Sequence, residues 1–343
     1  MCLGAARRHN MGEFALIARY FTRPTPKAVL GVGDDCALLQ SAPGMQMAIS
    51  TDMLVSGRHF FADVDPHALG HKALAVNLSD LAACGARPLA FTLALSLPQA
   101  DDAWLAPFSQ GLLALADQHG CELIGGDTTQ GPLNICITVF GEVPATQALL
   151  RSGARAGDDV YVSGTLGDAR LALEVLQGRL QLPQAVMEAA RWRLEMPTPR
   201  LALGMALRGI ASAAADVSDG LLGDLGHILK RSGVGATLDT DIAIKTLATY
   251  AYYTRATALF EQDIGAGRAL QCVLSGGDDY ELVFTAPVAQ RAAVQAASAS
   301  SATPVTRIGQ IDATPGLHLV NALGTPVSGQ FESFDHFAPP AQP

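Results

Sequence analysis

Hydrophobic and polar positions follow two periods along this 343-residue chain, and together they predict a mixture of helices and strands. Phe14, Ile17, Ala18 and Phe21 have helical spacing. Asp65 and Pro66 are typical of an N-cap and first helical position, so they predict a helix that ends before Gly85. The same reasoning predicts a helix from Asp101-Asp102 to Gly120 and strands near 28–32, 46–51, 89–97, 121–125 and 133–140.

The second half of the chain repeats this mixture. We expect helices near 167–177, 184–194, 200–209, 220–232 and 287–299, and strands near 160–162, 236–239, 270–275, 280–285, 304–308 and 317–320, with another strand ending at Asp216. Because the β pattern stops at Val143 and a new strand begins after a Gly-Asp turn, the sequence predicts a domain boundary within 144–157. The predicted division is a disordered extension at 1–11, an N-terminal domain at 12–145 and a C-terminal domain at 146–343.

Composition narrows the class of protein. The net charge of −9 and the lack of a Lys/Arg cluster argue against a nucleic-acid partner, and no apolar run is long enough to predict a membrane span or a signal peptide. A hydrophobic content of 49% supplies a folded core. The six cysteines form no C-x-x-C pair, which favours reduced thiols in a core over disulfides or zinc. We therefore expect a cytoplasmic, globular protein.

The most informative motifs are six short acidic segments in which carboxylates lie beside glycine or hydroxyl residues. They begin at Gly31, Ser50, Asn77, Gly125, Asp216 and Ser275. Taken singly, each is typical of an Asx turn or a helix cap. Taken together, they indicate a site for divalent cations shared between the two domains, because converging carboxylates repel one another by about 4 kcal/mol per pair unless a cation binds.

Magnesium fits this set best, since it prefers oxygen ligands and is commonly shared between carboxylates and phosphates. Calcium stays open, although no 12-residue calcium loop is present. Gly125-Gly126-Asp127 is typical of a phosphate-binding turn or of an ordinary tight turn. The chain contains no P-loop motif, no complete dinucleotide fingerprint and no protein-kinase motif, so a nucleotide phosphate would be held through metal ions.

Two further residues have open interpretations. Arg151, near the predicted boundary, either contacts phosphate or is a solvated linker residue. His59 lacks a nearby Ser or Cys partner, which favours a structural or substrate-contacting histidine over a catalytic one. From the residues alone, the sequence indicates a magnesium-dependent enzyme acting on phosphate compounds.

Taken in order, seven segments resemble the bacterial thiamine-monophosphate kinases, and the resemblance runs from about residue 12 to Phe334-Asp335-His336-Phe337. The segments are 12–21, 31–39, 50–55, 72–83, 124–129, 216–221 and 275–282. The resemblance implies an α/β (α+β) aminoimidazole ribonucleotide synthetase-like fold of two domains. It implies that the N-terminal sheet pairs across a homodimer and that a C-terminal α/β domain closes over the site.

The resemblance also implies the reaction and its residues. Thiamine monophosphate would be phosphorylated to thiamine diphosphate by ATP, through direct in-line transfer helped by several Mg²⁺ ions, with Asp127 and Arg151 as catalytic residues. The implied metal ligands are Asp35, Ser50, Thr51, Asp52, Asp80, Asp127, Asp216 and Asp219. The implied nucleotide contacts are Gly126, Asp127, Arg151 and Ser218, and the implied thiamine monophosphate contacts are His59, Asp278 and Phe334. Asp34 is either a ligand or a neighbour of the ligands.

Two alternatives stay open at this point. One is another ATP-dependent member of the superfamily, such as a selenophosphate synthetase-like enzyme, although Cys2 and Cys36 lack the expected glycine-rich setting. The other is a non-catalytic sensor of nucleotides or cations.

Overall fold

The computed structural model describes residues 12–253, 257–329, 331, 333 and 334, so the predicted extension at 1–11 lies outside the described residues. The chain divides into two compact units, and each is described by itself. Unit 1 comprises residues up to Ala42, Ile49–Asn77 and Pro88–Phe140; unit 2 comprises Pro43–Ala48, Leu78–Arg87 and Gly141 onward. The sequence predicted a single boundary within 144–157. The structure differs, because Pro43–Ala48 and Leu78–Arg87 precede that boundary in the chain and yet belong to unit 2.

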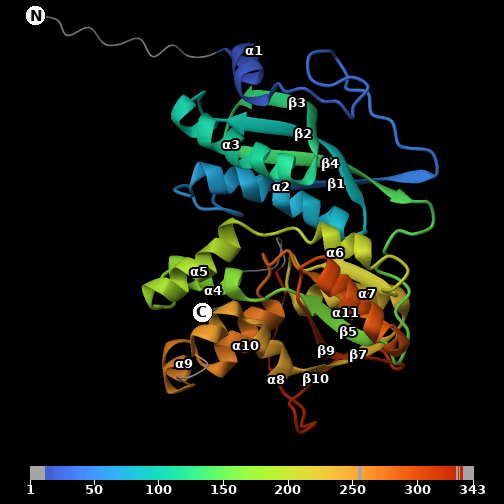
Figure 1. Ribbon diagram of the computed structural model, residues 1–343. Helices are drawn as coiled ribbons and strands as arrows, with labels where there is room; N and C mark the ends of the chain where they lie inside the picture. Colours follow the sequence, from blue (N-terminus) through green and yellow to red (C-terminus); the bar gives the residue numbers. More distant parts are fainter. Residues whose placement is uncertain (1–11, 254–256, 330, 332, 335–343) are drawn as a thin grey trace, which may run out of the picture. The chain divides into compact units, whose positions relative to one another are not determined.

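Unit 1 is built around a four-stranded sheet in the order β1-β4-β2-β3 (Figure 1). Its elements are α1 (Glu13–Leu16) with a π-helical turn (Ile17–Phe21), β1 (Met45–Val55), α2 (Pro66–Ala83), β2 (Arg87–Leu97), α3 (Asp102–His119), β3 (Glu122–Gln130) and β4 (Asn134–Pro144). The predicted caps are confirmed, since Asp65 accepts a hydrogen bond from the Ala68 amide and Asp101 accepts one from the Ala103 amide. Helices α2 and α3 lie across the sheet, and β1 and β3 are its two edges.

Unit 2 contains a six-stranded sheet in the order β10-β7-β9-β5-β8-β6, antiparallel except for the β10–β7 pair. Its strands are β5 (Asp159–Ser163), β6 (Ala213–Asp216), β7 (Gly235–Asp239), β8 (Leu282–Ala286), β9 (Val305–Asp312) and β10 (Gly316–Val320). Its α-helices are α4 (Asp168–Leu176), α5 (Gln184–Glu195), α6 (Leu201–Ala206), α7 (Leu221–Ser232), α8 (Thr240–Ala243), α9 (Thr257–Asp263), α10 (Ala266–Ser275) and α11 (Arg291–Ser300), and short 3-10 turns lie at Ile244–Thr246, Ala248–Tyr253 and Val288–Gln290.

Two of the predicted strands are wrong. Residues 28–32 form only isolated bridges, at Leu30 and Val32. Residues 270–275 lie within helix α10, where Ala269, Cys272 and Val273 are buried at helical spacing. A short apolar run does not distinguish a strand from a buried helix, and here the helix packs into the core of unit 2.

The cysteines are only partly the buried thiols that the sequence predicted. Cys121 and Cys272 are buried, Cys84 and Cys136 are partly buried, and Cys36 is exposed on the loop before β1. All five are free thiols. The prediction that the cysteines are buried in a core is therefore wrong for Cys36, which lies in a segment that forms no helix or strand.

Candidate functional site

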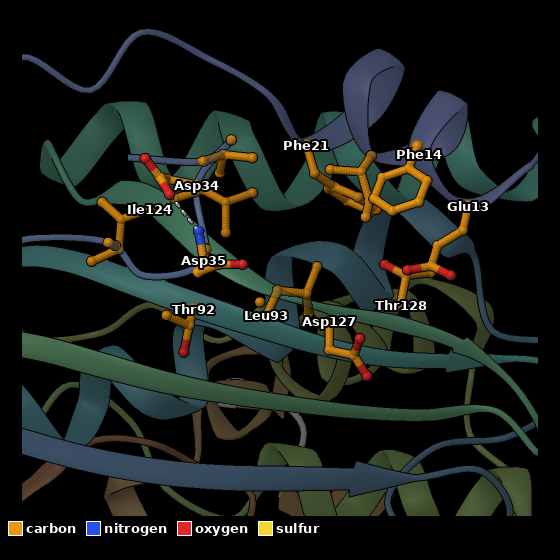
Figure 2. A pocket seen from close by; sticks show the side chains of 17 residues that line it. Glu13, Phe14, Phe21, Asp34, Asp35, Thr92, Leu93, Ile124, Asp127 and Thr128 are labelled. Carbon is orange, nitrogen blue, oxygen red and sulfur yellow. Dashed lines mark hydrogen bonds between the residues drawn. The ribbon is translucent and has the colours of Figure 1, made fainter. Parts of the chain in front are cut away.

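A cavity of about 630 Å³ lies in unit 1, between the N-terminal helical turn, the 32–37 loop, the middle of β2 and most of β3 (Figure 2). Its lining combines an apolar wall with four carboxylates, which are those of Glu13, Asp34, Asp35 and Asp127. The apolar wall includes Phe14, Ile17, Phe21, Leu93 and Ile124. Phe14 is 83% exposed, so its ring can contact a ligand without any rearrangement of the core. The cavity can therefore hold a molecule with a planar apolar part and an anionic or metal-bound part.

Two segments place the aspartates of this cavity. Asp34 accepts a hydrogen bond of 2.9 Å from the Asp35 amide, which fixes the turn that presents the pair. Asp127 lies on β3, opposite Ala94 of β2. Gly126 beside it has a φ of +149°, and a Cβ there would collide with the Leu93 carbonyl of β2. Gly126 is thus required by the close approach of two strands, whereas a Cβ at Gly125 would make only an ordinary contact with the Thr92 methyl, at 3.8 Å.

The structure corrects the expectation that the acidic segments are turns. Ser50, Thr51 and Asp52 lie inside strand β1, and the segment from Gly125 lies inside β3. The Thr51 hydroxyl is 2.8 Å from the Thr138 hydroxyl on β4, and β-branched residues favour this extended backbone. Because side chains alternate along a strand, Ser50 and Asp52 share one face and Thr51 lies on the other.

The two groups of predicted ligands in unit 1 lie at opposite edges of its sheet. Asp52 is on β1 and Asp127 is on β3, with β4 and β2 between them. Three strand spacings separate them by roughly 14 Å across the sheet. The Asp52 amide donates to Asn77 of α2 at 2.9 Å, so the strand is fixed in place on the helix. Within one copy of the chain, the sheet does not bring Asp52 and Asp127 together around a single ion.

In unit 2, three predicted residues lie where β6 ends and α7 begins. Asp216 accepts a hydrogen bond of 2.9 Å from Ser79, the neighbour of Asp80 on α2. The amides of Ser218 and Asp219 both donate to the buried Asp224 carboxylate, at 3.0 and 3.1 Å. Burial raises the pKa of Asp224 to about 6 against these hydrogen bonds. Asp224 therefore holds the turn that presents Ser218 and Asp219.

The predicted thiamine monophosphate contacts Asp278 and Phe334 lie beside this turn. The Asp278 amide donates to the Ser218 carbonyl at 2.8 Å, and the Phe334 amide donates to the Asp219 carbonyl at 3.0 Å. Unit 2 thus brings together Ser218, Asp219, Asp278 and Phe334 from segments far apart in the sequence.

The remaining two predicted residues have clear local settings. His59 Nδ1 accepts a hydrogen bond of 2.9 Å from the Val55 amide, so that nitrogen is unprotonated and the ring caps the end of β1. Arg151 is exposed and lies in the segment between β4 and β5. His59 thus has a structural contact, and the roles of His59 and Arg151 at the substrates stay predictions.

No group of three or more His, Cys, Asp or Glu side chains converges into a ready metal centre among residues 12–253, 257–329, 331, 333 and 334. Pairs of exposed carboxylates are present, as at Asp34 and Asp35. Magnesium is commonly bound by one or two carboxylates together with waters and substrate phosphates rather than by a complete protein cage. The oxygen donor set therefore fits magnesium that arrives with a nucleotide.

Sequence reasoning missed two features of these sites. Phe14 and its apolar neighbours form one wall of the unit 1 cavity, and the helical spacing that predicted the helix gave no sign of this role. In unit 2, Glu281 is completely buried and paired with Arg193 and Arg200. The sequence contained one signal for Glu281, since three of the four residues from Asp278 to Glu281 are acidic and a single turn needs only one such side chain.

Family models match most of the chain. The AIR synthase related protein N-terminal domain matches residues 33–143, and the corresponding C-terminal domain matches residues 155–320. No helix in the described part of the chain is long and apolar enough to cross a membrane.

Relatives and solved structures agree with this match. The chain is 48% identical to the thiamine-monophosphate kinase of Salmonella typhimurium over 96% of this chain and 99% of the relative. A crystal structure of thiamine-monophosphate kinase from Stenotrophomonas maltophilia is 46% identical, with a TM-score of 0.77 over 91% of this chain and 95% of that one. The structure of AaThiL complexed with AMPPCP and TMP is 28% identical, with a TM-score of 0.72 over 87% and 89% of the two chains.

Proposed function

Because the chain belongs to the thiamine-monophosphate kinase family, we propose that it transfers the γ-phosphoryl group of ATP to thiamine monophosphate, giving thiamine diphosphate and ADP. The near full-length similarity to the Salmonella kinase supports the reaction. The AaThiL complex with AMPPCP and TMP supports the pair of substrates, since AMPPCP is an ATP analogue that cannot transfer its terminal phosphate.

The observation that carries the proposal is the unit 1 cavity, which combines an apolar wall with exposed carboxylates. We assign the apolar wall to the nucleotide and Asp35 and Asp127 to magnesium. Gly126 and Ser218 supply backbone and hydroxyl contacts to the nucleotide, and Arg151 supplies a positive charge. Bound magnesium ions would neutralise the negative charge of the phosphates. Further metal contacts are assigned to Ser50, Thr51, Asp52, Asp80, Asp216 and Asp219.

The chemistry needs no general base. The attacking phosphate oxygen of thiamine monophosphate is already anionic near neutral pH, so no proton has to be removed before attack. The residues then have two tasks, which are to hold the two anionic substrates in line and to place positive charge at the transferred group. Arg151 performs the second task, and Asp278, Phe334 and His59 perform the first for thiamine monophosphate. No phosphorylated protein intermediate forms.

We also propose a cytoplasmic homodimer in which the N-terminal sheets pair. The opposite-edge positions of Asp52 and Asp127 support the dimer, because a second copy is able to bring a β1 edge close to a β3 edge. Ile49 and Met53 on β1 are exposed large apolar side chains, which is typical of an edge that a partner covers.

Phosphorus NMR of the reaction products tests the function. With ATP, magnesium and thiamine monophosphate, the kinase gives the paired signals of thiamine diphosphate as ATP is converted to ADP. Another ATP-dependent superfamily enzyme would release phosphate without this diphosphate, and a sensor would leave ATP intact. Either of these last two spectra, from folded protein, contradicts the proposal.

A further inference from the structure

The loop between α10 and β8 has an unfavourable backbone. Asp278 and Tyr280 have φ values of +60° and +51°, and Gly277 has a φ of +69°. Left-handed conformations of this kind are costly for residues with a Cβ, and they persist only where the surroundings hold the backbone in place. The loop from Gly276 to Glu281 therefore depends on its contacts for its shape.

One set of contacts joins this loop to the segment that carries Ser218. The Asp278 amide donates to the Ser218 carbonyl at 2.8 Å, and the Tyr280 amide donates to the Val217 carbonyl at 2.9 Å. In return the Val217 amide donates to the Glu281 carbonyl at 2.8 Å. These bonds continue the β6–β8 ladder, so any movement of the loop changes the position of Asp278 relative to Ser218.

A buried ion-pair cluster fixes the end of the loop. The Glu281 side chain has no exposed surface, and its carboxylate accepts hydrogen bonds from Ser163, Arg193 and Arg200. Arg200 binds both carboxylate oxygens, through Nε at 2.6 Å and a terminal nitrogen at 2.5 Å. Asp279 adds a second attachment, because its carboxylate accepts the Gly167 amide before α4. A buried carboxylate bonded to two guanidinium groups in this way has one fixed position.

A second buried carboxylate–arginine cluster lies at the N-terminal end of β5. Asp159, also without exposed surface, accepts a two-oxygen contact from Arg291, at 2.6 and 2.8 Å, and another bond from Arg307. Asp159 begins β5 and pairs with Ala286 at the end of β8, whereas Ser163 ends β5 near the start of β8. The same sheet thus contains one buried carboxylate–arginine cluster beside the Asp278 loop and a second one away from it.

We propose that Glu281, held by Arg193 and Arg200, is a positioning residue that keeps Asp278 in register with Ser218 and thereby sets the affinity for the phosphate acceptor. Glu281 is too deeply buried to touch a substrate and acts only through the loop. The identity of the acceptor rests on the proposed function, whereas the positioning of the loop does not.

Matched variants test the proposal by steady-state kinetics. Arg200→Lys and Arg291→Lys each keep the charge and remove a two-oxygen contact with a buried carboxylate. We expect Arg200→Lys to raise the KM for thiamine monophosphate at least tenfold and the KM for ATP much less, while Arg291→Lys leaves both within twofold. A general loss of folded protein would lower kcat and leave both KM values unchanged. Equal KM values in the two variants would overturn the proposal.

Amide hydrogen exchange gives a readout that does not need turnover. The Asp278 and Tyr280 amides should exchange at least tenfold faster in Arg200→Lys than in the parent, and at the parental rate in Arg291→Lys. If Arg200→Lys does not fold, Ser163→Ala is the second variant. It removes the bond from Ser163 Oγ to Glu281 and the bond that Ser163 Oγ accepts from the Leu282 amide, and it should shift the same amides in the same direction. Unchanged protection overturns the positioning role. A parent without kinase activity but with the expected exchange pattern overturns only the proposed function.

Discussion

Asp127 offers a direct residue-scale test, because it is exposed on β3 and its side chain can be changed without disturbing the core. Asp127→Asn keeps the shape and removes the charge that is assigned to magnesium. We expect magnesium-dependent turnover to fall by roughly a hundredfold or more, the scale of losing one electrostatic contact to the transferred group. The melting temperature should stay near that of the parent.

Asp117→Asn is the matched control for this change. Asp117 is an exposed carboxylate of the same unit that pairs with Arg23 at 2.8 Å, and it does not line the cavity. Its loss should leave turnover unchanged. Activity of Asp127→Asn within twofold of the parent would contradict the assigned role of Asp127.

Asp159 gives a prediction for acid stability. The hydrogen bond from Arg291 lowers the pKa of Asp159 below its ordinary value. A lowered folded pKa contributes stability above the unfolded pKa, near 4, and the contribution is lost as the pH falls through the folded value. Melting temperatures measured between pH 7 and pH 3 should therefore fall less steeply in Asp159→Asn than in the parent. Parallel curves would show that this pair does not contribute to acid unfolding.

The individual residues also show what the sequence can and cannot predict. The acidic motifs singled out Asp127, Asp219 and Asp278. The structure places Asp127 in the cavity lining and Asp219 and Asp278 in two neighbouring loops, and their roles as ligands or substrate contacts stay predictions. The contact between Thr51 on β1 and Thr138 on β4 was not predicted, because no local sequence pattern reveals which strands pair. Glu281 was missed because its arginine partners lie 88 and 81 residues away along the chain.

At the scale of an element, helix α7 contains two glycines with different surroundings. A Cβ at Gly223 would lie 2.5 Å from the Ser333 hydroxyl oxygen, whereas a Cβ at Gly226 would meet nothing within 4 Å. Gly223→Ala should displace Ser333 and break the bond from the Phe334 amide to Asp219. Because Phe334 is assigned to thiamine monophosphate, we expect a several-fold rise in the KM for that substrate.

Gly226→Ala is the control on the same helix. It should leave the KM unchanged and raise the free energy of unfolding by about 1 kcal/mol, the difference between alanine and glycine in a helix interior. Urea unfolding and steady-state kinetics measure the two quantities. A KM that is unchanged in Gly223→Ala would show that Ser333 and its neighbour do not set substrate affinity.

Element prediction succeeded where capping and periodicity agreed, and failed where one signal stood alone. Helix α3 had a capping Asp101, a helical period and a terminal Gly120, and all three are confirmed. Residues 270–275 had only an apolar run, and packing against the unit 2 core made them helical. The short helices between Thr240 and Asp263 had no clear period, because their shape depends on tertiary contacts.

At the scale of the whole molecule, the opposite-edge positions of Asp52 and Asp127 predict complementation between subunits. If one site takes Asp52 from one copy and Asp127 from the other, Asp52→Asn and Asp127→Asn homodimers are both inactive. Mixing the two after reversible dissociation gives dimers with one intact site, which restores about a quarter of the parental activity with random pairing. No recovery from verified mixed dimers would show that each site is complete within one copy.

The central claim is direct transfer from ATP to thiamine monophosphate, and the fate of the γ-phosphate tests it. Purified protein is supplied with ATP labelled at the γ-phosphorus, thiamine monophosphate and magnesium, and a parallel sample contains excess EDTA. The account predicts one labelled thiamine diphosphate for each ADP, no labelled protein, and no product with EDTA. Label that appears instead in inorganic phosphate or on the protein would contradict it.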